Sequence, residues 1–120
     1  METRFLQKER RSLKQPKINY RFSSDGRADY FSILDYIATT LVNPDAAEKF
    51  STDLHKSINL MRTFPEAYPV EVKIKYEFRK MVVGSYLVFY IVLEKEIVIA
   101  RILNSRQNFK KILKRSQSLS

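Results

Sequence analysis

The chain has 120 residues, 44% of them hydrophobic, which is enough for one domain with its own core and too few for several domains. It contains no cysteine, so disulfides, thiolate metal sites and cysteine nucleophiles are excluded. The formal net charge of +9 indicates an anionic partner, either nucleic acid or an acidic protein segment.

The positive charge gathers at the two ends of the chain. Residues 1–17 have a net charge of +4, residues 101–120 hold six cations and no acid, and residues 18–100 have a net charge of −1. A run of like charges repels itself unless an anion lies near, so we favour a binding role for the C-terminal run. Residues 1–16 form a basic N-terminal arm that fits a disordered, solvated segment equally well.

The hydrophobic pattern argues against a membrane protein. The longest apolar region, residues 81–93, falls short of the roughly 20 residues that span a bilayer. No apolar segment follows the N-terminal charges, so a secretory signal is not predicted. We expect a cytoplasmic protein without membrane contact.

The first predicted elements are a strand and a helix. Residues 17–22 alternate apolar and polar side chains, which is typical of a strand. Ser23 and Asp25 then supply an N-cap and a first-turn acid, which favour the start of a helix. Apolar residues at helical spacing predict a buried stripe made of Ala28, Phe31, Leu34, Ala38 and Leu41.

A second helix is predicted to follow almost at once. Asn43 provides a cap and Pro44 occupies the first helical position, so one helix ends and the next begins here. The apolar stripe of the second helix consists of Ala47, Phe50, Leu54, Ile58 and Met61. So short a joint predicts an antiparallel helix hairpin whose apolar face packs on a sheet.

The next residues predict antiparallel strands. Alternation over residues 70–76 leads into three strands within residues 76–103, joined by two tight turns. The first turn is Gly84-Ser85, where glycine in the first position suits a type II′ hairpin because it accepts a positive φ. The second turn consists of three charged residues, 94–96.

The turns set the register of these strands, and the register sets the faces of the sheet. We pair Val83 with Tyr86 and Leu93 with Ile97. One face is then almost wholly apolar and is assigned to the core, with Arg79, Met81, Val88, Tyr90, Val98, Ala100 and Ile102. The other is expected to be an open face, with Phe78, Lys80, Val82, Leu87, Phe89, Ile91, Ile99 and Arg101.

The end of the chain predicts a short basic helix. Phe109, Ile112 and Leu113 recur among lysines, and we expect this helix to dock on the sheet edge. Residues 114–120 follow as a tail, whose last residues look loose.

This order of elements resembles the RelE/ParE family of bacterial toxins, which belong to type II toxin-antitoxin or plasmid-stabilisation modules. The stretches that carry the likeness are DYFSILDYI and NPDAAEKF on the helices, FRKMVVGSYLVFY across the central hairpin, and IVIARILNSRQNFKKIL at the end. The likeness covers residues 17–113. It implies an α+β fold with an N-terminal strand, a two-helix antiparallel hairpin packed on a twisted, mainly antiparallel sheet, and a short C-terminal helix.

The resemblance also implies growth inhibition that a cognate antitoxin protein neutralises. The RelE kind cuts messenger RNA on the ribosome, whereas the ParE kind poisons DNA gyrase. The ribonuclease members use basic and proton-transferring side chains on the open sheet face and near the C-terminus. By this likeness Lys80 and Arg106 match functional basic residues, and Arg101 joins them as a candidate catalytic residue if the chain is a ribonuclease.

Two departures from the ribonuclease pattern favour gyrase or a related target. Leu87 follows Tyr86 where the ribonuclease members have arginine, and Phe109 and Leu113 occupy the region of their late tyrosine or histidine. Neither leucine nor phenylalanine can transfer a proton. Whether the chain is an enzyme stays open, because a divergent ribosome-dependent endoribonuclease and a non-catalytic nucleic-acid-binding module are alternatives.

The candidate residues for contact with nucleic acid or another target are Arg79, Lys110, Lys111, Lys114 and Arg115. Arg79 is also expected to lie opposite Tyr90 in the hairpin, where it could simply anchor the sheet. His55 is the only histidine, so we expect no metal and no other cofactor. The expected partners are the antitoxin and either DNA gyrase or the ribosome with its message.

Overall fold

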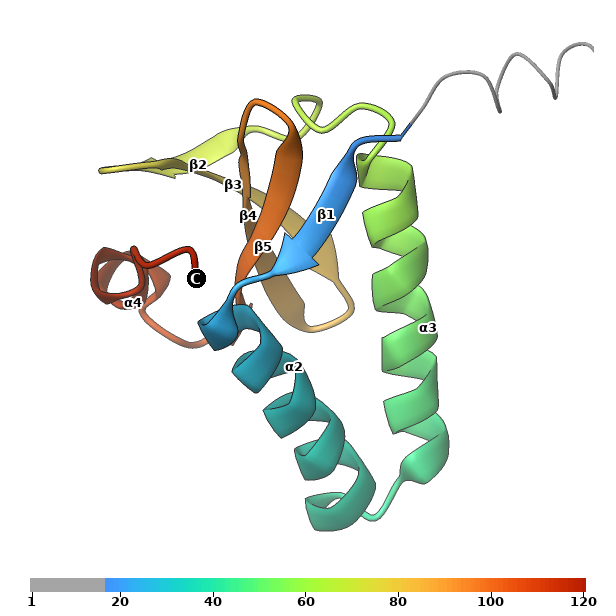
Figure 1. The fold of residues 1–120 in the computed structure, drawn as a ribbon. Helices are drawn as coiled ribbons and strands as arrows, with labels where there is room; N and C mark the ends of the chain where they lie inside the picture. Colours follow the sequence, from blue (N-terminus) through green and yellow to red (C-terminus); the bar gives the residue numbers. More distant parts are fainter. Residues whose placement is uncertain (1–16) are drawn as a thin grey trace, which may run out of the picture.

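The structure, a computed structural model, describes residues 17–120, and the N-terminal arm lies outside the described residues (Figure 1). The elements in chain order are β1 (Asn19–Phe22), α2 (Ser24–Asp35), the π-helical segment η1 (Tyr36–Thr40), α3 (Pro44–Met61), β2 (Val70–Lys73), β3 (Glu77–Val83), β4 (Tyr86–Val92), β5 (Glu96–Asn104) and α4 (Phe109–Arg115). The predicted α+β fold class is confirmed. No helix within residues 17–120 is long and apolar enough to cross a membrane.

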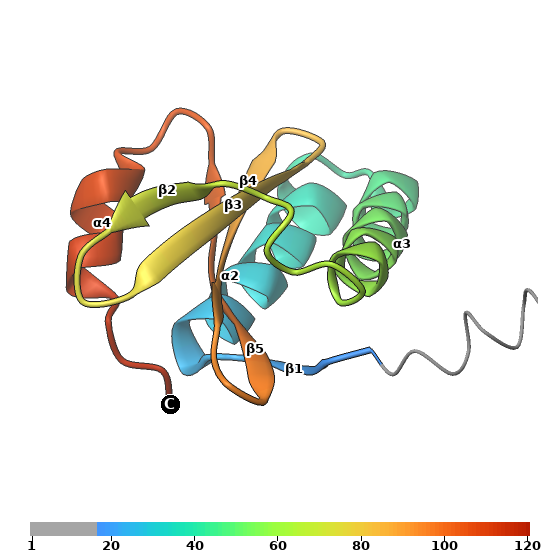
Figure 2. The ribbon, with the colours of Figure 1, turned by 90° about the horizontal axis from the view of Figure 1, so that it is seen from above.

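The sheet has helices on both faces. Its strand order is β1-β5-β4-β3-β2, with β1 parallel to β5 and the other neighbours antiparallel. Seen from above, α2 and α3 lie on one side of the sheet and α4 on the other (Figure 2). Each side has its own cluster of buried hydrophobic residues.

The position of α4 corrects the sequence prediction. This helix packs on the second face of the sheet and not on its edge, because Phe109 and Leu113 find an apolar surface there. The rings of Phe89 and Phe109 lie 5.2 Å apart, and Leu113 is fully buried. The face that was expected to be open is therefore covered in part by the chain's own C-terminal helix.

The β4–β5 hairpin contains a β-bulge. Phe89 lies opposite Arg101 as predicted, whereas the next residue, Tyr90, lies opposite Ile99. Ala100 is thus an extra residue in β5 that shifts the pairing by one.

This shift corrects the predicted faces near the second turn. Ile99 was expected on the open face but packs in the core beneath α2 and α3. Ala100 was expected in that core but packs on the α4 side, and Val98, opposite Ile91, lies on the α4 side too. Only residues beyond the bulge are affected, since a shift by one residue exchanges the faces of a strand.

The first turn has the predicted geometry and the second is tighter than predicted. Gly84 has a φ of 59° and Ser85 has a negative φ, as a type II′ turn requires. In the second turn the Leu93 N–H donates to the Glu96 carbonyl oxygen at 2.8 Å, so two residues and not three form the loop, and Val92, not Leu93, lies opposite Ile97. The tighter turn is what makes the bulge necessary farther along β5.

Helix α3 forms as predicted. The side chain of Asn43 accepts a hydrogen bond from the Ala46 N–H at 3.1 Å, which caps the helix. The buried residues of this helix are Ala47, Phe50, Leu54, Ile58 and Met61, the same five that its stripe predicts.

Helix α2 and the segment after it match the predicted stripe only in part, because Leu34 and Ala38 pack against the core as predicted whereas Ala28 is exposed. Phe31 and Leu41, expected to be buried, are 59% and 55% exposed. The side that faces the core also includes Gly26, Tyr30, Ile33 and Ile37, which the predicted stripe left out. The reason is a close approach at the start of the helix, where a Cβ on Gly26 would lie 2.3 Å from the carbonyl oxygen of Ile99. This contact fixes the rotation of the helix about its axis.

Tyr90 is the largest fully buried side chain of the core. Its hydroxyl donates a hydrogen bond to the carbonyl oxygen of Pro65 at 2.6 Å, which ties β4 to the loop before β2. Burial raises the pKa of Tyr90 to about 12, because the ionised phenolate would lose its hydration.

We expect the folded state to lose stability between about pH 10 and pH 12. The tyrosine pKa is about 10 in the unfolded chain and about 12 in the fold, so the contribution of Tyr90 is complete below pH 10 and is lost as the pH rises to 12. Two pKa units correspond to at most about 2.7 kcal/mol. Urea unfolding of the parent and of Tyr90→Phe at pH 9 and pH 12 measures this contribution. An equal alkaline loss in both proteins would contradict it.

Candidate functional site

The outer side of α4 is strongly basic. Asn108 caps this helix by accepting a hydrogen bond from the Lys111 N–H at 3.3 Å, and the apolar side chains of the helix face the sheet. The opposite side carries four exposed cations, which we call the basic α4 surface: Lys110, Lys111, Lys114 and Arg115.

Helix stability alone does not explain these four cations. Lys114 and Arg115 lie in the last turn, where positive charge is favourable, but Lys110 and Lys111 lie in the first turn, where an acid would be stabilising. No ion pair joins any of the four to an acid in residues 17–120. The basic α4 surface is therefore suited to an anion that the described chain does not supply.

Lys80 lies on the same face of the sheet as α4, but its charge is balanced. It is opposite Phe89, whose ring contacts Phe109 of α4. Its Nζ lies 3.1 Å from a carboxylate oxygen of Glu71, and both side chains are partly buried. The structure thus brings Lys80 close to α4 as one member of an ion pair.

Arg101 joins three segments of the fold. Its Nε and Nη2 donate to the two carboxylate oxygens of Asp29 at 2.7 and 2.9 Å, and its Nη1 donates to Ser116 Oγ at 2.8 Å. Asp29 also accepts the backbone N–H of Ile102 at 2.9 Å. The hydrogen bonds to Asp29 raise the pKa of the Arg101 guanidinium. All three of its nitrogens are engaged in tying β5 to α2 and to the segment after α4.

Arg79 lies away from the basic α4 surface. It is opposite Tyr90, as predicted, and its Nη1 donates to the carbonyl oxygens of Glu66 and Tyr68 at 3.1 and 2.6 Å. Because neighbouring strand residues point to opposite faces, Arg79 lies on the helix side of the sheet and Lys80 on the α4 side. Its contacts anchor the loop between α3 and β2.

Two further cations lie near α4. Arg106 is exposed in the loop before the helix, where its backbone N–H donates to Asn104 Oδ1 at 2.9 Å. Lys75 lies in the β2–β3 turn, and its backbone N–H donates to Gln117 Oε1 at 3.0 Å, which places this turn beside the segment after α4 (Figure 2). Sequence reasoning missed Lys75 because no local pattern connects residues 75 and 117.

The only histidine and the buried Tyr90 lie away from α4, whereas Tyr76 packs against the hydrophobic cluster on the α4 side. His55 is on α3, on the other side of the sheet from α4, with its Nδ1 2.8 Å from the Ser51 carbonyl oxygen. The Tyr90 hydroxyl is buried and donates to Pro65. In the described part of the chain, no group of three or more histidine, cysteine, aspartate or glutamate residues could hold a metal ion. The cations of the α4 side are suited to anion binding.

Replacing Arg101 with alanine should lower the free energy of unfolding by about 3 kcal/mol, because Asp29, 16% exposed, would keep an uncompensated charge. Lys49→Ala is the matched control, since it removes a cation from the exposed Lys49–Asp53 pair and should change stability by less than about 0.5 kcal/mol. Urea unfolding measures both. Equal small losses would show that the Arg101 contacts contribute little to the fold.

Comparisons with known proteins agree with this architecture. A family model described as "ParE toxin of type II toxin-antitoxin system, parDE" matches residues 20–109. One solved structure, described as "Chromosomal ParDE TA system from P. aeruginosa", is similar with a TM-score of 0.62 and 19% identity over 73% of this chain and 96% of that chain. No curated protein matches the chain.

The structural likeness, at 19% identity, demonstrates the shared fold. The family model spans the region from β1 to the start of α4, which includes the helix hairpin and the whole sheet. The chain therefore belongs to the ParE toxin family of type II toxin-antitoxin systems.

Proposed function

We propose that this toxin stops growth by acting on DNA gyrase, or on a related target that handles nucleic acid, and that the basic α4 surface contacts that target. The observation that carries this proposal is the set of four exposed cations on α4 without acid partners in residues 17–120. Such a surface attracts DNA phosphates or an acidic protein surface.

A binding mode of action is favoured over RNA cleavage by the contacts of the candidate catalytic side chains. Cleavage needs a base, an acid and a cation at the reacting phosphate. Lys80 is paired with Glu71, and Arg101 is held by Asp29 and Ser116. Leu87 is buried beneath α4 and offers no charge. A ribosome-dependent ribonuclease is the alternative, and it would have to release Lys80 from Glu71.

We also infer that a cognate antitoxin neutralises this chain. The similar solved structure is described as a ParDE toxin-antitoxin system. The charge of the basic α4 surface favours an antitoxin segment that is acidic, or amphipathic with an acidic side. Covering the surface with such a segment would block contact with the target.

Replacing the four cations of the basic α4 surface with alanine should abolish growth arrest when the protein is produced without an antitoxin. Colony formation should rise at least about a hundredfold, because four phosphate contacts contribute steeply to affinity. The four side chains are exposed, so thermal unfolding should stay within a few degrees of the parent.

The matched control removes four exposed cations from other parts of the fold: Lys17, Arg27, Lys56 and Lys95. It changes the net charge by the same amount and should leave the growth arrest intact. Growth arrest that persists in the α4 variant would overturn the assignment of this surface. Relief in both variants would attribute the effect to net charge alone.

A further inference from the structure

The basic α4 surface continues beyond the helix at both of its ends. Gln117 joins the last turn of α4 to the β2–β3 turn, because its Oε1 accepts the Lys75 N–H at 3.0 Å and its Nε2 donates to the Lys114 carbonyl oxygen at 3.2 Å. The exposed Lys75 therefore lies beside the C-terminal end of the helix (Figure 2). Arg106 is exposed in the loop that leads into the other end. We call these two cations and the basic α4 surface together the extended basic surface.

The loop that carries Arg106 is held by hydrogen bonds between its own residues. Besides the bond from the Arg106 N–H to Asn104 Oδ1, the Gln107 Oε1 accepts the Asn104 N–H at 2.8 Å and the Gln107 N–H donates to the Asn104 carbonyl oxygen at 3.0 Å. The backbone positions of both additional cations are thus fixed by neighbouring segments. A fixed array of charges favours binding, because little ordering is needed when the partner arrives.

The charge of the extended basic surface is not balanced by the described chain. Neither Lys75 nor Arg106 forms an ion pair with an acid in residues 17–120. In the β2–β3 turn Glu77 is paired with Lys73 at 3.6 Å, and no acid follows Glu96 in the sequence. Six positive charges on one surface attract a partner that carries several negative charges.

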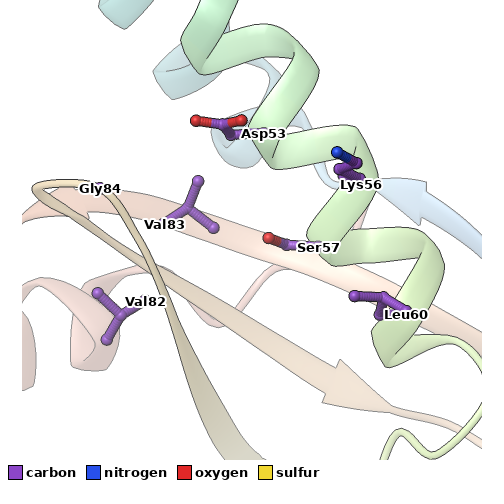
Figure 3. Close-up of a pocket in the computed structure, with 7 residues that line it drawn as sticks. All are labelled: Asp53, Lys56, Ser57, Leu60, Val82, Val83 and Gly84. Atoms are coloured by element: carbon purple, nitrogen blue, oxygen red, sulfur yellow. The ribbon is translucent and has the colours of Figure 1, made fainter.

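This surface lacks the apolar centre that protein interfaces have. No large apolar side chain in residues 73–77 or 104–120 is exposed. Val82, opposite Leu87 on the α4 side of the sheet, is 61% exposed and points away from α3 (Figure 3). A single exposed apolar residue is ordinary. The surface therefore matches a polyanion that binds through charge better than it matches a protein segment.

The spacing of the α4 cations suits the backbone of a nucleic-acid duplex. Lys110 and Lys111 precede Lys114 and Arg115 by one turn, so the two pairs are about 6 Å apart along the helix axis. Each strand of duplex DNA has one phosphate per about 3.4 Å of its axis, so both pairs can contact one backbone. Binding of single strands relies on exposed aromatic rings, whereas the aromatic residues near α4 pack against the hydrophobic cluster beneath it.

We propose that the extended basic surface binds the phosphate backbone of duplex DNA without reading its sequence. This inference rests on the proposed function, because it names DNA as the anion that the basic α4 surface contacts. The toxin would thereby be held on the DNA that its target handles. Phosphate contacts carry no sequence information, so duplexes of different sequence should bind with equal affinity.

Fluorescence anisotropy of a labelled DNA duplex tests this proposal with the complete chain. Six phosphate contacts predict at least about a thousandfold loss of affinity between about 50 and 200 mM salt. Lys75→Ala and Arg106→Ala should each make the slope of log affinity against log salt shallower by about 0.9. The N-terminal arm is the same in every variant, so these differences belong to the extended basic surface.

Lys56→Ala is the matched control and should leave the slope unchanged. It removes an exposed cation from α3, on the other side of the sheet, one turn after Asp53 (Figure 3). Lys75→Arg keeps the positive charge and should retain the slope of the parent. This variant separates the loss of a phosphate contact from the loss of the Lys75 contact with the Tyr76 ring.

Equal slopes in the parent, Lys75→Ala and Arg106→Ala would overturn the proposal, and so would an equal decrease in the Lys56→Ala control. Tighter binding to a single strand or to an RNA duplex than to the DNA duplex would overturn it as well. No binding of DNA at about 50 mM salt would assign the surface to an acidic protein instead.

The fate of this proposal can be told apart from that of the proposed function. If DNA does not bind but the four-cation α4 variant loses growth arrest, the DNA proposal fails and the proposed function stands with a protein contact. If DNA binds with the expected slopes and that variant still arrests growth, the proposed function fails and DNA binding stands by itself.

Discussion

The contact between the start of α2 and the edge of β5 holds the helix hairpin against the sheet. β1 pairs with β5 only as far as Ile99, so beyond that point β5 has β4 on one side and no strand on the other. Helix α2 takes its place, because Ser23 Oγ donates to the Ala100 carbonyl oxygen and Asp29 accepts the Ile102 N–H. Unpaired strand edges are unfavourable when buried, and this helix satisfies them with its own side chains.

The same region of the fold explains why Arg101 is paired while the cations on the outer side of α4 are not. Arg101 is held by Asp29 and by Ser116, which links the edge of β5 to the end of α4. With that arginine engaged in the fold, the outer cations of α4 are exposed on a helix whose position is fixed. A rigid, charged surface suits recognition of an anionic target, because little ordering is needed on binding.

Much of the fold could be predicted because the local signals and the tertiary structure agree. In α3 the cap at Asn43 and the apolar stripe lead to the same helix that the structure contains. In β5 the local signals could not decide which residues face which side of the sheet. Residues on both faces are apolar, and an alternating pattern cannot reveal the extra residue at Ala100. The rotation of α2 depends on Gly26 against β5, a contact between residues far apart in the chain.

The candidate site was predicted in composition but not in arrangement. The charged run at the C-terminus indicated a basic helix, and its four outer cations are exposed together. The partners of Lys80 and Arg101 were not predictable, because Glu71 and Asp29 approach them only through strand pairing and helix packing. Charge type can be read from a sequence, whereas the acid that balances each cation is a property of the fold.

One pair of assays tests the central claim most directly. Purified protein is added to a DNA gyrase supercoiling reaction and, in parallel, to a cell-free translation reaction whose message is mapped at its 5′ ends. The account predicts that supercoiling is inhibited, or that gyrase-dependent DNA cleavage appears, while the message stays intact. Cuts that appear only on translated message, with gyrase unaffected, would contradict it and establish a ribosome-dependent ribonuclease.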